Sequence, residues 1–190
     1  MLKAISLFSG AGGMDEGARR AGINVIAASE LDKYACETYK DNHPSSKLFE
    51  GDINEHFDRI TSYTDIDIVF GGPPCQGFSV AGKMDPNDPR SELVFKFCDV
   101  VQAVRPKAFV MENVKSLGTL TKFEKVRNEI FRRMEVLGYK VSMNVLNAKE
   151  FGVPQSRERV FFIGVMDAVR PISYSDFEQY RQTPPTLREA

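Results

Sequence analysis

One cysteine of the chain stands in a stiff turn that follows a short apolar segment. Residues 66–70 read Ile-Asp-Ile-Val-Phe, and the chain continues as Gly71-Gly72-Pro73-Pro74-Cys75-Gln76-Gly77-Phe78-Ser79. Two glycines let the backbone turn sharply and approach a ligand, and two prolines fix the φ angle. Cys75 therefore follows a predicted strand at the position where open α/β sheets bind their ligands. Its thiol is a candidate nucleophile, and the alternative is a small buried hydrophobe in a tight turn.

The groups that could act together with this thiol are an acid and two arginines. Glu112 follows the apolar segment 108–111, and Arg157 and Arg159 precede the apolar segment 160–165. A carboxyl group can hold or donate a proton, and a thiolate can attack carbon. This combination suits attack on an electron-poor ring carbon, followed by group transfer from a nucleoside cofactor.

Other kinds of cysteine chemistry are disfavoured by the remaining residues. We expect His43 and His56 on surface elements far from Cys75 in sequence, which argues against a Cys-His hydrolase. The wide spacing of Cys36, Cys75 and Cys98 gives no Cys-x-x-Cys pair, no disulfide framework and no zinc pattern. We assign Cys98 to the packing of its helix and predict no metal site.

A glycine-rich turn and two acids indicate a nucleoside site. The turn Ser9-Gly10-Ala11-Gly12-Gly13 follows the apolar segment 4–8, but Asp15 stands where the dinucleotide pattern Gly-x-Gly-x-x-Gly needs its third glycine. Glu30 ends the second apolar segment, 20 residues beyond Gly10, and can accept hydrogen bonds from both hydroxyls of a ribose. For Glu30 the alternative is a solvated strand-end acid. Asp52 ends the third segment and can accept a hydrogen bond from the exocyclic amine of adenine.

These residues are positioned by a predicted alternation of strands and helices. Strands are predicted at 4–8, 23–29, 47–50, 66–70, 108–111, 139–147 and 160–165. Helices are predicted at 14–21, at 32–42 with Asp32 as N-cap, at 91–104 and at 121–137. The polar stretch 83–90 is expected to form a surface loop. Seven strands with intervening helices predict an α/β sheet with right-handed crossovers.

The composition fits one folded domain rather than a disordered or membrane protein. The chain has 190 residues and is 42% hydrophobic, which is enough for a substantial core. Residues 1–100 carry a net charge of −6 and residues 101–190 carry +5, so only the second half could face an anion. No signal peptide precedes the first strand and no apolar run approaches 18 residues, which fits a cytoplasmic setting without a membrane.

Four segments resemble, in order and spacing, the motifs of the DNA cytosine-5 methyltransferases. They are Phe8-Ser-Gly-Ala-Gly-Gly13, the Cys75 segment, Glu112-Asn-Val114 and Gln155-Ser-Arg-Glu-Arg159. The resemblance covers residues 3–165, and its Pro-Pro-Cys-Gln element is highly specific. It implies a Rossmann-like S-adenosyl-methionine-dependent methyltransferase fold, with a seven-stranded, mostly parallel sheet and helices on both faces. It also implies a cytoplasmic, nucleoid-associated protein of bacterial or phage type.

The resemblance implies a catalytic role for four residues. Cys75 would attack C6 of cytosine as a thiolate, and Glu112 would hydrogen-bond and protonate N3. Arg157 and Arg159 would orient O2 of the base and the catalytic groups. C5 would then take the methyl group of S-adenosyl-methionine, leaving S-adenosyl-homocysteine, and loss of the C5 proton would release Cys75. The target base has to leave the DNA duplex to reach this pocket.

The resemblance also implies residues that contact the cofactor and the DNA. Leu31 would lie against the adenine, where the family often has an aromatic residue, and a loop at 79–90 would close over the base. The cofactor would be held by Phe8, Gly10, Gly12, Gly13, Glu30, Leu31, Asp52, Ile53, Pro73 and Leu93. Double-stranded DNA would meet Gln76, Ser79 and Arg90.

Residues 1–166 are expected to form the catalytic and cofactor-binding domain, and residues 167–190 a linker or tail with three prolines. Family members continue after a segment like Pro185-Thr186-Leu187 into a target-recognition domain and a closing segment. We therefore expect this chain to be inactive alone and to need a second chain or C-terminal half. An exposed apolar patch at the open side would favour self-association.

Two further functions compete with this interpretation. One is a noncatalytic module that binds a cofactor or partner with the same fold, but binding alone needs neither Cys75 nor Glu112 nor Arg159. The other is methylation of a transfer RNA by the same chemistry. The RNA-acting branch usually has a different tripeptide after the Pro-Pro-Cys-Gln element, so we rank it lower.

Overall fold

The protein is described by a computed structural model that covers residues 1–74 and 92–186. Its seven strands are hydrogen-bonded in the order β3-β2-β1-β4-β5-β7-β6, and the pairs β1–β2, β1–β4, β2–β3 and β4–β5 are parallel. The chain divides into two compact units, of which the first comprises Met1–Pro74 and Glu92–Met111. The described part of the second unit is 112–186. We describe each unit by itself.

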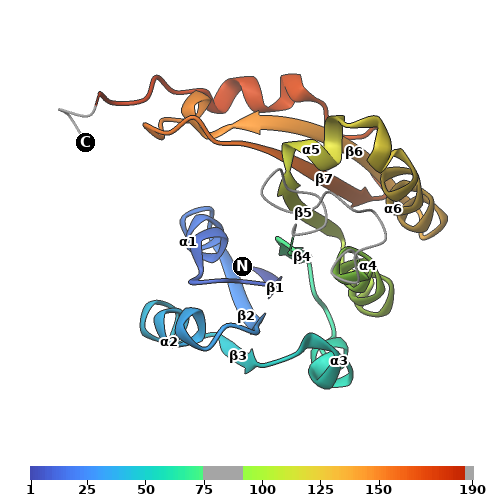
Figure 1. Cartoon of the computed structure of the whole chain (residues 1–190). Helices are drawn as coiled ribbons and strands as arrows, with labels where there is room; N and C mark the ends of the chain where they lie inside the picture. Colours follow the sequence, from blue (N-terminus) through green and yellow to red (C-terminus); the bar gives the residue numbers. More distant parts are fainter. Residues whose placement is uncertain (75–91, 187–190) are drawn as a thin grey trace. The chain divides into compact units, whose positions relative to one another are not determined.

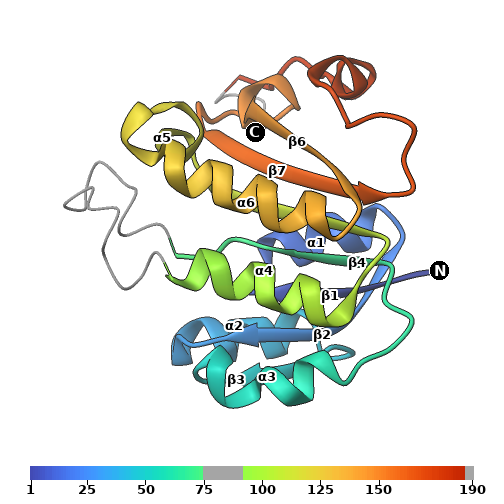
Figure 2. The same ribbon diagram turned by 90° about the vertical axis from the view of Figure 1, so that its right-hand side faces the viewer.

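The first unit alternates strands with helices. Its elements are β1 (Leu2–Leu7), α1 (Gly13–Arg20), β2 (Ile23–Glu30), α2 (Lys33–Asn42), β3 (Lys47–Glu50), α3 (Ile53–Thr61), β4 (Ile68–Gly71), α4 (Glu92–Val104) and the first residues of β5 (Ala108–Val114). Helices α1 and α2 lie on one face of these strands, and α3 and α4 lie on the other (Figure 1). Figure 2 views the same unit from the side of α3 and α4. Both faces of the strands are therefore covered.

The change of face follows from the strand order. The chain builds β1, β2 and β3 in one direction, and then crosses back to place β4 beside β1. Right-handed crossovers put the connecting helices on opposite faces when the direction reverses. The carboxyl ends of β1 and β4 mark the topological switch point, which is where open sheets bind ligands. Gly71 ends β4 there, and a Cβ on it would lie 2.0 Å from the carbonyl oxygen of Leu7.

Short acidic caps start two of these helices. The carboxylate of Asp32 accepts a hydrogen bond from Ala35 N at 2.8 Å, which confirms the predicted N-cap of α2. The carboxylate of Asp52 accepts one from Asn54 N at 2.8 Å and starts α3, a helix that the sequence analysis did not predict. A buried cluster of Ala4, Val25 and Phe70 joins the three central strands, and Met14 and Ala18 of α1 pack against it.

The second unit is built around an antiparallel strand pair. It contains the end of β5, then α5 (Lys115–Thr119), η2 (Thr121–Phe123), α6 (Glu124–Val136), β6 (Tyr139–Asn147), η3 (Ala148–Glu150), β7 (Glu158–Met166) and η4 (Tyr174–Tyr180). Strands β6 and β7 pair from Tyr139↔Met166 to Asn147↔Glu158. Helix α5 packs closely on β7, since a Cβ on Gly118 would lie 2.7 Å from a methyl carbon of Val160.

The predicted fold class is confirmed, and most strands lie where the sequence placed them. Besides the unpredicted α3, other details differ. The helix predicted at 121–137 begins as a 3-10 turn, α5 was not predicted, and Glu112 lies inside β5 rather than beyond its end. The segment 167–186 contains η4, held by a capping box at Ser173 and by an ion pair of Arg170 with Asp176 at 2.6 Å.

Candidate active site

The glycine-rich turn in the first unit bends through left-handed backbone conformations. Phe8, Gly10 and Gly12 have φ angles of 54°, 57° and 90°. Only glycine adopts such angles without strain, so the turn depends on Gly10 and Gly12. A Cβ on Gly10 would meet nothing within 4 Å, whereas one on Gly12 would lie 2.3 Å from the His43 ring. The turn is therefore open at Gly10 and tightly packed at Gly12.

Glu30 at the end of β2 holds this turn. Its carboxylate accepts hydrogen bonds from Gly10 N at 2.7 Å, Leu31 N at 2.9 Å and Asp32 N at 2.8 Å. Three backbone donors fix the orientation of the carboxylate. Oε1 accepts two of these bonds and Oε2 only the one from Gly10, so Oε2 keeps a lone pair and Glu30 can support the turn and still accept a bond from a sugar hydroxyl.

The other residues predicted to hold a nucleoside lie at the same edge of the strands, with differing exposure. Leu31 is 71% exposed, an unusual position for an apolar side chain unless something covers it. Asp52 is exposed and follows β3, which pairs with β2 through Glu30↔Glu50. Ile53 is only 4% exposed, so its side chain belongs to the core.

Three further residues complete the predicted set. Gly13 is exposed at the start of α1, and Pro73 is buried two residues beyond the end of β4. Leu93 lies half-buried in the first turn of α4. Cys75, Gln76, Ser79 and Arg90 lie outside the described residues.

In the second unit the predicted acid and both arginines come together. Glu112 Oε1 lies 3.0 Å from Arg159 Nε and 3.7 Å from Arg157 Nη2. The side chains of Glu112 and Arg159 are 20% and 26% exposed, whereas that of Arg157 is 49% exposed. The cluster is therefore shielded from water on the side of Arg159.

Burial raises the pKa of Glu112 above its usual value, although Arg159 and Arg157 act in the opposite direction. Desolvation disfavours the carboxylate because a charge is less well solvated away from water. Glu112 therefore remains protonated to a higher pH than an ordinary glutamate. A protonated carboxyl group can donate a hydrogen bond, which is what attack on a nitrogen heterocycle requires of an acid.

A charged pair fixes the start of β7, the strand that carries Arg159. Lys115 Nζ contacts both carboxylate oxygens of Glu158 at 2.9 Å. Glu158 and Arg159 are neighbours in β7, so their side chains point to opposite faces. The Lys115–Glu158 contact and the Arg159–Glu112 contact thus involve side chains that leave β7 in opposite directions.

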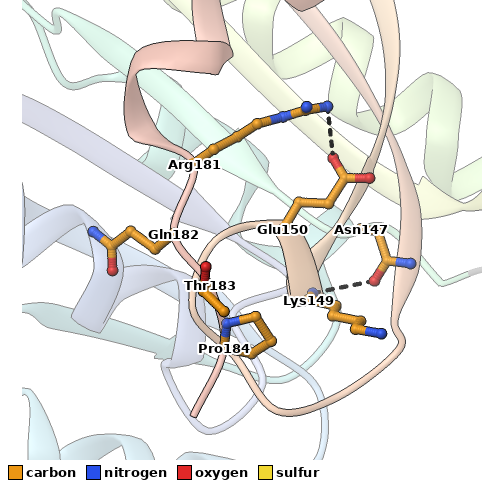
Figure 3. Close-up of a pocket in the computed structure, with 7 residues that line it drawn as sticks. All are labelled: Asn147, Lys149, Glu150, Arg181, Gln182, Thr183 and Pro184. Carbon is orange, nitrogen blue, oxygen red and sulfur yellow. Dashed lines mark hydrogen bonds and ion pairs between the residues drawn. The ribbon is translucent and has the colours of Figure 1, made fainter.

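A polar pocket of about 520 Å³ lies beside the loop that leads into β7 (Figure 3). Arg181 reaches Glu150 Oε2 at 3.3 Å, so its charge is partly compensated within the pocket. Asn147 Oδ1 accepts hydrogen bonds from Lys149 N at 3.1 Å and Arg157 N at 3.2 Å, which ties the pocket wall to the backbone of Arg157. The pocket is lined by Asn147, Lys149, Glu150, Arg181, Gln182, Thr183 and Pro184.

The profile of the family "C-5 cytosine-specific DNA methylase" matches residues 2–189. The chain belongs to this family. The resemblance carried by the four sequence motifs is thereby confirmed, and the cofactor of the cytosine-5 methylases is S-adenosyl-methionine.

Relatives with curated descriptions agree with this assignment. The Type II methyltransferase M1.HphI of Haemophilus parahaemolyticus is 45% identical over 173 residues, which cover 87% of this chain and 46% of the relative. The Type II methyltransferase M.AquIA of Picosynechococcus is 46% identical over 176 residues, or 85% of this chain and 71% of the relative. The chain spans 46% and 44% of the relatives M1.HphI and M.DdeI.

A solved structure shares the fold over nearly the whole chain. It is a prophage-encoded protein of E. coli, described as a DNA modification methyltransferase, with 32% sequence identity and a TM-score of 0.79. The match covers 98% of this cytosine-5 methylase chain and 52% of the other.

The first unit fits the cofactor of the cytosine-5 methylases. S-adenosyl-methionine offers two ribose hydroxyls and an adenine. Glu30 offers a fixed acceptor oxygen, Oε2, Gly10 allows close approach of the backbone, and Leu31 offers an exposed apolar surface. Within residues 1–74 and 92–186 no group of three His, Cys, Asp or Glu side chains could hold a metal ion. None of the helices described there is long and apolar enough to cross a membrane.

One expectation about this methylase is wrong. His43, predicted on a surface element, is only 9% exposed and caps the end of α2 with its ring near Gly12. The sequence analysis also missed a buried carboxylate, Asp15, that contacts Ser6 and Tyr39. The available signal was the position of Asp15 on the side of α1 that bears Met14 and Ala18, which pack on the core.

Proposed function

We propose that this chain carries the catalytic part of an enzyme that transfers a methyl group from S-adenosyl-methionine to C5 of cytosine in DNA. The observation that carries the proposal is the Glu112–Arg159 pair, at 3.0 Å, in a family that methylates cytosine. A module that only bound a cofactor would need no shielded acid with a raised pKa. The related Type II methyltransferases extend the proposal to a restriction-modification role.

The chain's own residues would activate the base. The thiolate of Cys75 forms a bond to C6 of cytosine, and the electron pair of the C5–C6 double bond moves into the ring. Protonated Glu112 donates to N3, which neutralises the charge as it develops. Arg159 and Arg157 present guanidinium donors that can hold O2 of the base and keep Glu112 in place.

Release requires the reverse movement of electrons. After C5 has gained the methyl group, the C5 proton is lost to a base, the C5–C6 double bond re-forms, Cys75 leaves as a thiolate, and the N3 proton returns to Glu112. Bound S-adenosyl-methionine supplies the electrophilic methyl group. The proposed holders of the cofactor are Glu30 and Asp52 by hydrogen bonding, Leu31 by apolar contact, and the backbone of the Phe8–Gly13 turn.

The proposed substrate is double-stranded DNA whose target cytosine has left the helix stack. A base inside a duplex is inaccessible to a thiol, because its C6 is covered by neighbouring base pairs. Gln76, Ser79 and Arg90 flank Cys75 in sequence and are the proposed contacts to the DNA and the base. A protein that acts on this substrate would be found in association with the cell's DNA.

The test is a tritiated-methyl transfer assay on mixed-sequence DNA. The chain is supplied with the part of M1.HphI that lies beyond the matched region, because the chain covers 46% of that relative. We expect Cys75→Ser to abolish transfer while affinity for S-adenosyl-homocysteine changes by less than about tenfold, since an alkoxide is far scarcer than a thiolate at neutral pH.

Two results would overturn the proposal. Normal turnover by the Cys75→Ser variant would rule out Cys75 as the nucleophile. Tight cofactor binding with no transfer by the unmodified chain, with the added part present and folded, would favour the noncatalytic binding module.

A further inference from the structure

A carboxylate is completely buried beneath the glycine-rich turn. Asp15, in the first turn of α1, is 0% exposed. Its Oδ2 accepts a hydrogen bond from Ser6 Oγ of β1 at 2.9 Å, and its Oδ1 accepts one from Tyr39 Oη of α2 at 2.7 Å. One side chain thus joins three elements that surround the turn, and α1 and α2 lie on the same face of the strands (Figure 1).

This arrangement is costly for stability. Burial raises the pKa of Asp15, while the hydrogen bonds from Tyr39 and Ser6 and the nearby His43 ring lower it. A folded-state pKa above the ordinary value means that the protonated form favours folding, and this contribution is lost as the pH rises through the folded pKa. Above the folded pKa, ionised Asp15 therefore opposes folding, and the hydrogen bonds from Tyr39 and Ser6 offset only part of the effect of burial on its pKa.

A second side chain of α2 reaches the turn directly. His43 Nε2 lies 3.1 Å from Gly12 O, so the ring donates to this carbonyl oxygen from Nε2. The ring of His43 packs against that of Tyr39 at a centroid distance of 4.7 Å. Gly12 O also accepts the first helical bond of α1, from Glu16 N at 2.9 Å. Gly12 is therefore fixed between α1 and α2, and Tyr39 supports both Asp15 and His43.

The outer half of the turn is held by β2. Ser9 N donates to Ser29 O at 3.0 Å, and Gly10 N donates to Glu30 at 2.7 Å. The turn is thus clamped at Ser9 and Gly10 by β2 and at Gly12 by α2. The left-handed angles at Phe8, Gly10 and Gly12 persist only if both sides hold, because Phe8 in particular is strained there.

We propose that Asp15 and Tyr39 are positioning residues for the cofactor: they hold the Phe8–Gly12 turn in the conformation that receives S-adenosyl-methionine, without touching it. The inference rests on the proposed function for the identity of the ligand. Asp15, which breaks the dinucleotide glycine pattern, occupies the space between α1, β1 and α2. A glycine at this position, as in the dinucleotide pattern, has no side chain and lets the helix pack closely on the strand.

The first measurement is amide hydrogen exchange of the ligand-free chain. Tyr39→Phe removes one hydroxyl, and Asp15→Ala removes the acceptor. In both variants we expect the amides of Gly10 and Gly12 to exchange at least about tenfold faster, the size expected when a hydrogen bond to a charged group is lost. Exchange in β6 and β7 should stay unchanged. Asp15→Asn keeps an acceptor for Tyr39 and should recover most of the protection.

The matched control is Tyr63→Phe, the same substitution at a ring of this unit that packs edge-on against Phe49. It should leave exchange in the turn unchanged. Unchanged exchange at Gly10 and Gly12 in both Tyr39→Phe and Asp15→Ala would overturn the inference. An exchange rate that rises equally over the whole first unit would also overturn the inference, because that result indicates a purely structural role.

The second measurement is calorimetric binding of S-adenosyl-homocysteine. We expect the dissociation constant to rise about tenfold in Tyr39→Phe and to stay constant in Tyr63→Phe, in line with the loss of one hydrogen bond to a charged group. If the unmodified chain binds no S-adenosyl-homocysteine even with the added part of M1.HphI present, the proposed function fails, and the exchange measurement still decides whether Asp15 and Tyr39 hold the turn. If it binds, equal affinity of Tyr39→Phe and the unmodified chain would contradict the positioning role.

Discussion

We assign two roles to the carboxylate of Glu30: it supports the glycine-rich turn, and it is the proposed acceptor for the ribose of the cofactor. It accepts three backbone hydrogen bonds, one from the turn and two from the residues that lead into α2. A ribose would therefore meet an acceptor that is already oriented, and little side-chain entropy would be lost on binding. Loss of Glu30 should therefore alter the conformation of the turn and weaken binding of the ligand.

We expect Glu30→Ala to weaken S-adenosyl-methionine binding by about 1.5–3 kcal/mol, the range for a hydrogen bond to a charged group. Isothermal calorimetry would measure this change. Glu37→Ala, at an exposed position of α2, serves as the control and should bind normally. Unchanged affinity in a folded Glu30→Ala protein would remove Glu30 from the site.

The protonation of Glu112 depends on its neighbours. Burial raises its pKa, and Arg159 at 3.0 Å lowers it more than Arg157 at 3.7 Å. Because the folded pKa is above the ordinary value, the proton is retained at low pH and lost as the pH rises through that pKa. A methyl-transfer step that needs protonated Glu112 should weaken over the same range.

We therefore expect Arg159→Gln to raise the pKa of Glu112 further, since the charge that favours the carboxylate is removed. Carbon-detected NMR titration of the labelled side-chain carboxyl would follow this change. Arg157→Gln should cause a smaller rise in the same direction. A lowered pKa in Arg159→Gln would show that the contact in solution differs from the one described.

At the scale of the elements, the site depends on how closely β4 lies against β1. Gly71 pairs with Leu7 at the carboxyl end of both strands, just before the segment that carries Cys75. A Cβ at position 71 would meet the Leu7 carbonyl oxygen at 2.0 Å, and backbone atoms cannot move aside as a flexible side chain can. This pairing fixes where the proposed nucleophile leaves the sheet.

We expect Gly71→Ala to destabilise the fold by more than about 2 kcal/mol, because a clash with backbone belongs to the severe class of substitutions. Thermal unfolding followed by circular dichroism would measure it. Gly17→Ala makes the same change in α1, where an added Cβ meets nothing within 4 Å. That control should stabilise the protein by about 0.5–1 kcal/mol. Equal melting temperatures for Gly71→Ala and the unmodified chain would contradict the packing described here.

At the scale of the whole molecule, the chain matches a family over residues 2–189 and covers about half of several relatives. We expect residues 1–190 alone to bind the cofactor weakly and to methylate no DNA, and transfer to appear when the remaining part of M1.HphI is added. The tritiated-methyl assay with and without that part tests this. Robust methylation by the chain alone would show that the described units suffice.

The sequence predicted the positions of the strands along the first unit and the residues of the second-unit cluster for a physical reason. Apolar segments, glycine-rich turns and strand-end acids act locally, so β2, β3 and β6 fell where they were expected. Asp32 was identified as a cap because capping involves residues three apart. Helix α3 carries a similar cap, Asp52, but that acid had been interpreted only as a ligand contact.

The sequence alone determined the family, the α/β class, and which acids and arginines are candidates for the site. All three follow from residue type and spacing. Only the tertiary structure decided which polar groups are buried. Asp15 and His43 look like surface residues in the sequence, and they become internal partners of Ser6, Tyr39 and Gly12 because α1, α2 and β1 fold together. The helical position of Asp15 indicates only that it lies on the core side of α1. Its partners, and the pKa of Glu112, depend on contacts between distant segments that no local pattern encodes.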